Sequence, residues 1–228
     1  MKNNFFTGIK NAFLNIGFAL KIKIRELFIF GKNKWWWKLF LPSFFIYSVS
    51  SPYRIAKKEA ENYPEYKFDN FSYGDTPPLA ISKILQNIDY KNYSQIFDLG
   101  SGKGTAAISF YFLSKLPVTG IELLPGYIIQ SNRLKEITGA TEVNFINKDL
   151  KNMDFSRKAI YYCASTAFED GLMHDLTENL KQLPGDSIIT IVHNPLPEDW
   201  FELFHKERMQ FTWGYDTVFF YRRTFPDE

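Results

Sequence analysis

Between residues 94 and 193, short apolar segments alternate with stretches of helical periodicity, and this alternation limits the possible folds more than any other feature of the sequence. The apolar segments are rich in β-branched residues and lie at residues 94–100, 118–122, 142–149, 159–164 and 187–193. Helical stretches at residues 103–115, 125–138 and 169–182 separate most of them. Strands joined through helices form right-handed βαβ units, so the pattern predicts a parallel sheet with helices on both faces.

Two further strands are expected near the C-terminus, at residues 208–213 and 217–223. Only three residues separate them, which is the spacing of a hairpin and too short for a crossover. The sequence therefore predicts an α/β fold: a doubly wound, Rossmann-like, seven-stranded sheet with five parallel strands and a C-terminal antiparallel hairpin. In such sheets a ligand binds across the carboxyl ends of the strands.

The first strand runs into the glycine-rich turn "DLGSGKG", residues 98–104. A phosphate-binding P-loop is excluded, because Gly104 follows Lys103 where a hydroxyl residue is needed and Phe97 stands where the first glycine is needed. A dinucleotide is disfavoured, because Asp98 would bring its negative charge close to a pyrophosphate. The turn therefore favours a ligand that is cationic or zwitterionic near Asp98.

Three acids stand at the ends of successive strands: Asp98, Glu122 and Asp149. S-adenosylmethionine suits this set, with Asp98 and the turn backbone near its methionyl amine, Glu122 accepting from its ribose hydroxyls and Asp149 accepting from its adenine amine. The helix after the turn would direct its first amides toward the carboxylate of the methionyl group. S-adenosylmethionine is therefore the predicted cofactor.

The segments "DLGSGKG", "GIE" and "NKDL" resemble the cofactor motifs of the class I, seven-stranded S-adenosylmethionine-dependent methyltransferases. The resemblance covers roughly residues 70–225 and implies methyltransferase activity. It also implies cofactor contacts from Leu150 and from the turn residues Gly100, Ser101, Gly102 and Gly104.

The upstream segment "YGDTPP", residues 73–78, looks like a loop of the non-SET protein lysine methyltransferases, some of which are membrane-anchored. That resemblance implies cofactor contacts from Tyr73 and Thr76 and a protein lysine side chain as the methyl acceptor. An Asn/Asp-Pro-Pro-Tyr/Phe motif, found in many enzymes that methylate nucleobase nitrogens, is replaced after the fourth strand by "CASTAFED". No nucleic-acid partner is therefore expected.

Candidate catalytic residues on the acceptor side are Ser165, Glu169 and His193, which follow the fourth and fifth strands. They would align the acceptor or take up its proton. Structural roles are open for each, since an acid favours the first turn of a helix and a histidine often serves as a hydrogen-bonding group. Lys103 is expected on the surface and Cys163 in the core, and one cysteine allows neither an intrachain disulfide nor a cysteine-rich zinc site, so no metal site is predicted.

The first sixty residues differ from the rest, with eleven lysines and arginines against two acids, whereas the remaining residues carry a net charge of −7. Apolar residues from Phe5 to Leu20 keep a helical spacing, and three tryptophans follow at Trp35, Trp36 and Trp37. This mixture predicts attachment to an anionic membrane surface, while a membrane-spanning segment and packing on the protein itself remain alternatives. The expected organisation is an extension (1–53), a helical lead-in with a cofactor-covering loop (54–93) and a methyltransferase core (94–228).

The sequence thus predicts a methyltransferase held, peripherally or by one anchor, at the cytoplasmic face of a membrane and acting on protein lysine. The alternatives are a methyltransferase for a small molecule or lipid, and a catalytically silent scaffold that binds the cofactor.

Overall fold

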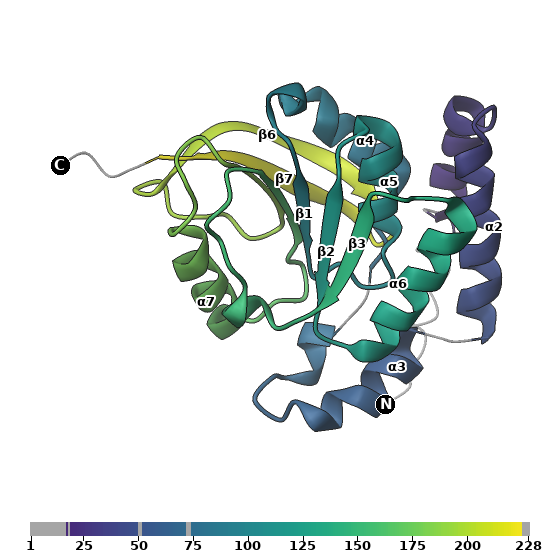
Figure 1. Cartoon of the computed structure of the whole chain (residues 1–228), viewed down its shortest axis with the longest axis horizontal. Helices are drawn as coiled ribbons and strands as arrows, with labels where there is room; N and C mark the ends of the chain where they lie inside the picture. Colours follow the sequence, from purple (N-terminus) through teal and green to yellow (C-terminus); the bar gives the residue numbers. More distant parts are fainter. Residues whose placement is uncertain (1–16, 18, 50–51, 72–73, 225–228) are drawn as a thin grey trace, which may run out of the picture.

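A computed structural model describes residues 17, 19–49, 52–71 and 74–224 (Figure 1). Within these residues one sheet has seven strands in the order β3-β2-β1-β4-β5-β7-β6. Strands β1 to β5 pair in parallel, and β7 runs antiparallel to both β5 and β6. The predicted fold class is confirmed. The strands are β1 (Ile96–Leu99), β2 (Val118–Glu122), β3 (Val143–Asn147), β4 (Ile160–Ala164), β5 (Ile188–Val192), β6 (Phe201–Phe211) and β7 (Gly214–Arg223).

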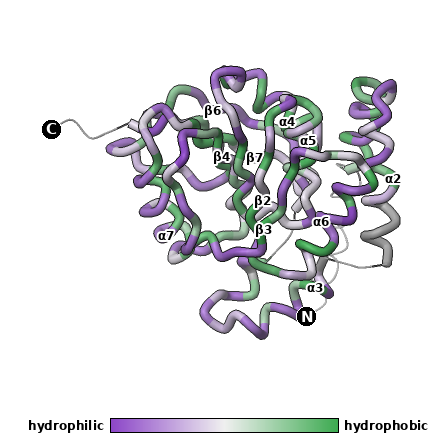
Figure 2. The backbone as a smooth tube through the Cα atoms, viewed as in Figure 1, coloured by the Kyte–Doolittle hydropathy of each residue, from purple (hydrophilic) through white to green (hydrophobic). Residues whose placement is uncertain are grey.

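Helices cover both faces of this sheet. Successive strand residues point to opposite sides, so both faces carry apolar side chains that the helices bury. In β4, Tyr162 packs in the apolar cluster beneath α4, α5 and α6, whereas Tyr161 packs in the cluster beneath α7. Figure 2 shows the hydrophobic colour concentrated on the central strands, which are buried on both faces. The helices are α2 (Lys34–Val49), α3 (Pro52–Glu59), α4 (Pro78–Gln86), α5 (Thr105–Ser114), α6 (Pro125–Thr138) and α7 (Asp170–Leu180), with 3-10 turns η1 (Ala60–Asn62), η2 (Phe68–Phe71), η3 (Tyr90–Asn92) and η4 (Leu150–Asn152).

The C-terminal hairpin is longer than the sequence predicted. Strand β6 begins at Phe201, seven residues before the expected start at residue 208. It is the edge strand of the sheet, and from Glu202 to Arg208 its exposed residues alternate with half-buried ones. Because an edge strand with one solvated face needs no continuous apolar run, this part of the strand carries a weak sequence signal. The turn lies between Phe211 and Gly214, which are paired.

The N-terminal extension packs on the core. Residues 19–30 are helical, and α2 lies alongside α6 as an outer layer (Figure 1). The Trp35 ring stacks on Phe112 of α5 with 5.2 Å between centroids, and Trp36 is buried. Of the three tryptophans, Trp37 alone is classed as exposed, at 38%. Trp35 and Trp36 therefore follow the packing alternative rather than the membrane-anchor prediction.

Glu26 ties this extension to α4. Its side chain is fully buried and forms an ion pair with Lys23 at 2.7 Å. It also accepts hydrogen bonds from the Trp36 indole nitrogen at 3.4 Å and from the Leu79 amide at 3.2 Å. The Leu79 amide belongs to the first turn of α4, where backbone donors have no partner within the helix. A residue of the extension thus supplies an acceptor to a helix of the core.

In the part of the chain that the structure describes, no helix combines the length and the apolar character needed to cross a membrane. The predicted amphipathic helix from Phe5 to Leu20 lies almost wholly outside the described residues.

Candidate functional site

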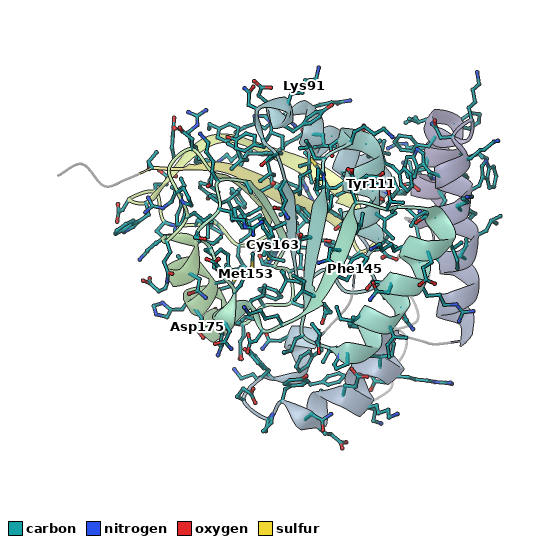
Figure 3. The ribbon with its side chains drawn as sticks, in the orientation of Figure 1. Lys91, Tyr111, Phe145, Met153, Cys163 and Asp175 are labelled. Carbon is teal, nitrogen blue, oxygen red and sulfur yellow. The ribbon has the colours of Figure 1, made fainter. Side chains whose placement is uncertain are left out.

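The glycine turn after β1 adopts the left-handed conformation its composition favours. Gly100, Gly102 and Gly104 have φ values of +75°, +52° and +82°. At Gly104 an added Cβ atom would lie 2.4 Å from the Phe145 ring, labelled in Figure 3, and 2.8 Å from Ser131. Glycine is therefore needed at this position for both its backbone angle and its lack of a side chain.

A cavity, which we call the main cavity, opens at the carboxyl ends of β1, β2 and β4. Asp98, Glu122 and Asp149 all line it, as the prediction of a shared site requires. Gly104 does not line it and lies instead against Phe145 and Ser131, and Tyr73 is outside the described residues. The other predicted cofactor contacts that line it are Thr76, Gly100, Ser101, Gly102 and Leu150.

Asp98 is the least compensated of the three carboxylates. It is 2% exposed, and its Oδ2 atom has no hydrogen-bond partner among the described residues. Burial raises the pKa of Asp98 to about 7, with a further contribution from Glu122 and partial relief from the Ala107 amide. A buried carboxylate with a spare acceptor atom is a site for a cationic donor such as an ammonium group.

Glu122 joins the glycine turn to β2. One oxygen accepts from the Gly102 amide at 2.8 Å and the other from the Leu124 amide at 2.8 Å. Burial nevertheless raises the pKa of Glu122 to about 7. Each carboxylate oxygen has a further lone pair, so Glu122 can accept from a ligand hydroxyl while it holds the turn.

Asp149 meets a segment that covers the main cavity, which we call the covering segment (residues 63–71 and 74–76). Its Oδ2 atom accepts from the Tyr66 hydroxyl at 2.7 Å, and its Oδ1 atom accepts from the Lys151 amide at 2.9 Å. Asn70, Phe71 and Gly74 of the same segment also line the cavity. Asp149, which is predicted to contact adenine, therefore also holds the covering segment in place.

Glu169 holds the covering segment from the opposite side. Its amide donates to Asn70 Oδ1 at 2.8 Å, and its carboxylate accepts from Asn70 Nδ2 at 3.0 Å. Lys67 adds an ion pair at 2.6 Å. The hydrogen bonds from Lys67 and Asn70 lower the pKa of Glu169.

The predicted catalytic residues Ser165, Glu169 and His193 are all absent from the lining of the main cavity, so the geometry does not support the roles expected for them. Ser165 is fully buried and donates to the Val192 carbonyl at 2.7 Å. His193 has a φ of +81° and lies 3.2 Å from an oxygen of Asp216. These contacts stabilise the loops that follow β4 and β5.

Tyr162 is a site residue that the sequence analysis did not single out. It comes from β4, next to β1, and its hydroxyl lies 2.6 Å from Thr76 Oγ1. Burial raises its pKa well above the usual range, so the phenol stays neutral. The sequence signal that was available is the pair Tyr161-Tyr162 within a predicted strand, because adjacent strand residues point to opposite faces of the sheet.

Lys103 was expected on the surface, and that expectation is wrong. The side chain is 2% exposed, and burial lowers its pKa to about 8 while the charge of Asp75 opposes the shift. The charge interaction shows that buried Lys103 lies near Asp75 of the covering segment. The prediction for Cys163 is confirmed: it is fully buried in the middle of the sheet (Figure 3).

No protein-family model matches the sequence, and no curated protein matches it. Solved structures do match its fold. The RNA methyltransferase from Salinibacter ruber, in complex with S-adenosyl-L-homocysteine, has a TM-score of 0.55 and 22% identity over 68% of this chain and 95% of that one. The magnesium protoporphyrin IX methyltransferase from Synechocystis, with bound S-adenosylmethionine, has a TM-score of 0.56 and 10% identity over 76% and 98%. TrmN from Thermus thermophilus has a TM-score of 0.56 and 17% identity over 65% of this chain, which spans only 49% of TrmN.

The chain therefore has the Rossmann-like fold of the S-adenosylmethionine-dependent methyltransferases. The strand order and the antiparallel hairpin agree with that class.

Proposed function

We propose that this protein is an S-adenosylmethionine-dependent methyltransferase. The observation that carries the proposal is the convergence of Asp98, Glu122 and Asp149 on one cavity beside the glycine turn. The spare Oδ2 atom of Asp98 and the raised pKa values of Asp98 and Glu122 indicate that these carboxyl groups suit a ligand that carries a positive group.

The cofactor, when bound, supplies a methyl group on a positively charged sulfur, which an acceptor's lone pair attacks in line while the bond electrons stay on sulfur. Asp98 would accept from the methionyl amine, Glu122 from the ribose hydroxyls and Asp149 from the adenine amine. The covering segment would exclude water from one side of the cavity through Tyr66 and Phe71, which line it. Catalysis by such a site consists mainly of alignment.

Titration calorimetry with S-adenosylmethionine tests the proposal. Asp98→Asn and Glu122→Gln should each weaken binding about 10- to 100-fold, the effect of losing a charge-assisted hydrogen bond. Glu136→Gln removes an exposed charge from α6 and is the matched control, expected to bind like the parent protein. Absence of binding by the parent protein would reject the proposal.

The likeness of residues 73–78 to the corresponding loop of lysine methyltransferases favours a protein lysine side chain as one acceptor. The fold itself serves diverse acceptors, since the named neighbours include enzymes for RNA and for magnesium protoporphyrin IX. A small molecule or lipid is the second candidate and is favoured by a cavity beside the N-terminal helices. Transfer of radiolabel from the cofactor to extract, sorted into protein, RNA and organic fractions, distinguishes these acceptors. Binding without any transfer would favour the silent scaffold.

We also propose that the protein attaches to the cytoplasmic face of a membrane. Residues 19–30 bury Ile22, Glu26 and Phe30, and the opposite side of the helix is apolar and exposed. Phe28 there is 84% exposed. We call this exposed side the outer face; it comprises Leu20, Ile24, Leu27 and Phe28 and is flanked by exposed Lys21, Arg25 and Lys32. Apolar side chains beside basic ones suit anionic lipid headgroups.

Sedimentation with anionic liposomes tests this attachment. Phe28→Glu should reduce the bound fraction strongly, because it places a negative charge within the outer face. Ile129→Glu is the matched control, since Ile129 is 71% exposed on α6, outside that face. Equal partitioning of the parent protein and Phe28→Glu would contradict the proposal.

A further inference from the structure

A further cavity, of about 230 Å³, lies between the N-terminal helices and the core. We call it the lateral cavity. Ala19 and Lys23 line it from the first helix, and Trp36, Leu39 and Phe40 line it from α2. The core contributes residues 75–78, Thr105 and Thr212. The extension therefore forms one side of a chamber whose other side belongs to the predicted methyltransferase core.

The walls of the lateral cavity are mainly apolar. Trp36, Leu39 and Phe40 of α2 and Pro77 and Pro78 of the core all line it. An apolar cavity of about 150 Å³ in another protein holds a benzene ring, so this volume suffices for a ring with a short chain or for a folded alkyl segment. Apolar walls release water at little cost and gain from contact with an apolar body.

The lateral cavity adjoins the main cavity through shared residues. Thr76 and Thr105 line both of them. Thr76 Oγ1 lies 2.6 Å from the Tyr162 hydroxyl, and Thr105 Oγ1 donates to Asp75 Oδ1 at 2.7 Å. The two cavities therefore meet at short polar side chains, and a polar group of a ligand in the lateral cavity that bonds to Thr76 or Thr105 would lie beside the main cavity.

The charged side chains around the lateral cavity already have partners, which favours an uncharged polar group. Lys23 forms an ion pair with buried Glu26 at 2.7 Å and lies over the Phe40 ring. Asp75 accepts a hydrogen bond from Thr105 Oγ1 at 2.7 Å, and its charge acts on buried Lys103. A hydroxyl or an uncharged amine can hydrogen-bond to the threonine hydroxyls without needing a counter-charge, which a carboxylate or phosphate would need.

We propose that the lateral cavity binds the methyl acceptor, which is an amphiphile with an apolar body and a single hydroxyl or amine group. The inference rests on the proposed methyltransferase function and selects the small-molecule or lipid acceptor over protein lysine as its substrate class. The apolar body lies against α2 and the two prolines, and the polar group lies at Thr76 and Thr105, beside the main cavity. The N-terminal extension is then the part of the chain that selects the acceptor.

Photolabelling of the full chain with a medium-chain alkanol that carries a diazirine tests the site directly. Labelled peptides are mapped by mass spectrometry, with and without S-adenosylhomocysteine. The label should fall on residues 36–40 and 75–78 in one saturable site per chain. Ala19→Phe should fill the cavity and reduce this labelling about tenfold or more. Leu20→Phe adds the same ring to the outer face and should leave the labelling unchanged.

Two results would overturn the inference: a label confined to the outer face, or a label on residues 36–40 and 75–78 that Ala19→Phe leaves intact. Mapping on the parent protein decides the first even if the variant does not fold. Calorimetry with S-adenosylhomocysteine on the same samples separates the two proposals. Binding there with no label in the lateral cavity rejects the acceptor site alone, whereas no binding rejects the methyltransferase function.

Discussion

Asp98 and Glu122 are carboxyl groups that the fold buries before any ligand arrives, and their pKa values are both raised to about 7. The folded protein therefore binds more protons than the unfolded chain between about pH 4 and pH 7. Stability contributed by these groups falls as the pH rises through that window, because the unfolded chain ionises more readily. A cationic ligand reverses the penalty, since it favours the ionised form.

The first prediction concerns pH. The rise in melting temperature caused by saturating S-adenosylmethionine should be small at pH 6 and larger at pH 8, because its amine binds ionised Asp98. Asp98→Asn should flatten that dependence, while Glu136→Gln should preserve it. Differential scanning fluorimetry over the pH series measures both. A ligand-induced shift that does not change between pH 6 and pH 8 would contradict the assignment of Asp98.

The second prediction compares two glycines with similar backbone angles. Gly104→Ala and Gly139→Ala each force a side chain onto a positive φ, +82° and +74°, at a cost of about 1–2 kcal/mol. At Gly104 the new methyl also meets Phe145 and Ser131, which adds about 1–3 kcal/mol, whereas nothing lies within 4 Å at Gly139. Urea denaturation should show the larger loss for Gly104→Ala, and equal losses would mean that Phe145 moves aside freely.

At the scale of elements, the first part of the covering segment is held to the core at two points, with Tyr66 bonded to Asp149 and Asn70 bonded to Glu169. These bonds cross from the lead-in to loops that follow β3 and β4. Opening the main cavity therefore requires that polar contacts break, while the sheet beneath keeps its pairing.

The third prediction tests that attachment. Asn70→Ala removes both hydrogen bonds to Glu169, and the loss of about 1–3 kcal/mol should speed dissociation of S-adenosylhomocysteine about tenfold or more. Asn92→Ala, which removes an exposed side-chain bond to Asp89, is the control and should leave the rate unchanged. Stopped-flow displacement gives the rates. Equal rates would show that the covering segment does not retain the ligand.

Elements whose signal is local were predictable from sequence. Strand β2 and helix α6 begin and end where the apolar run and Pro125 indicated, and the strand-end acids converge because parallel strands end at one edge. Contacts between distant residues were not predictable. The residues around Glu169 give no indication that its partner is Asn70, which lies 99 residues away in the sequence. The first half of β6 lacks a continuous apolar run, so its sequence does not distinguish it from a loop. Burial of Lys103 depends on how the turn folds against Asp75.

At the scale of the molecule, the extension and the core share one set of buried contacts. Glu26 accepts from Trp36 within the extension and from Leu79 in the core. Leu39 of α2 belongs to the same apolar cluster as the helices that cover the sheet. The boundary expected at residue 53 therefore does not separate two independent packing units.

The fourth prediction follows from Glu26. Glu26→Ala leaves the Trp36 and Leu79 donors without their acceptor and should reduce the free energy of unfolding by about 1–3 kcal/mol, since Lys23 is partly exposed and can be hydrated. Glu26→Gln keeps one acceptor oxygen and should cost less. Glu178→Ala, which breaks an exposed pair with Lys181, should cost at most about 1 kcal/mol. Chemical denaturation ranks the three, and a Glu26→Ala protein as stable as Glu178→Ala would contradict the anchoring role.

Thr76 lines both the main cavity and the lateral cavity, and its hydroxyl is hydrogen-bonded to Tyr162 from the central strand β4. Two ligands that both contact Thr76 can favour different rotamers of its side chain, so the first to bind determines which rotamer the second meets. Turnover would then follow a compulsory order, and product-inhibition patterns would trace that order to one hydroxyl.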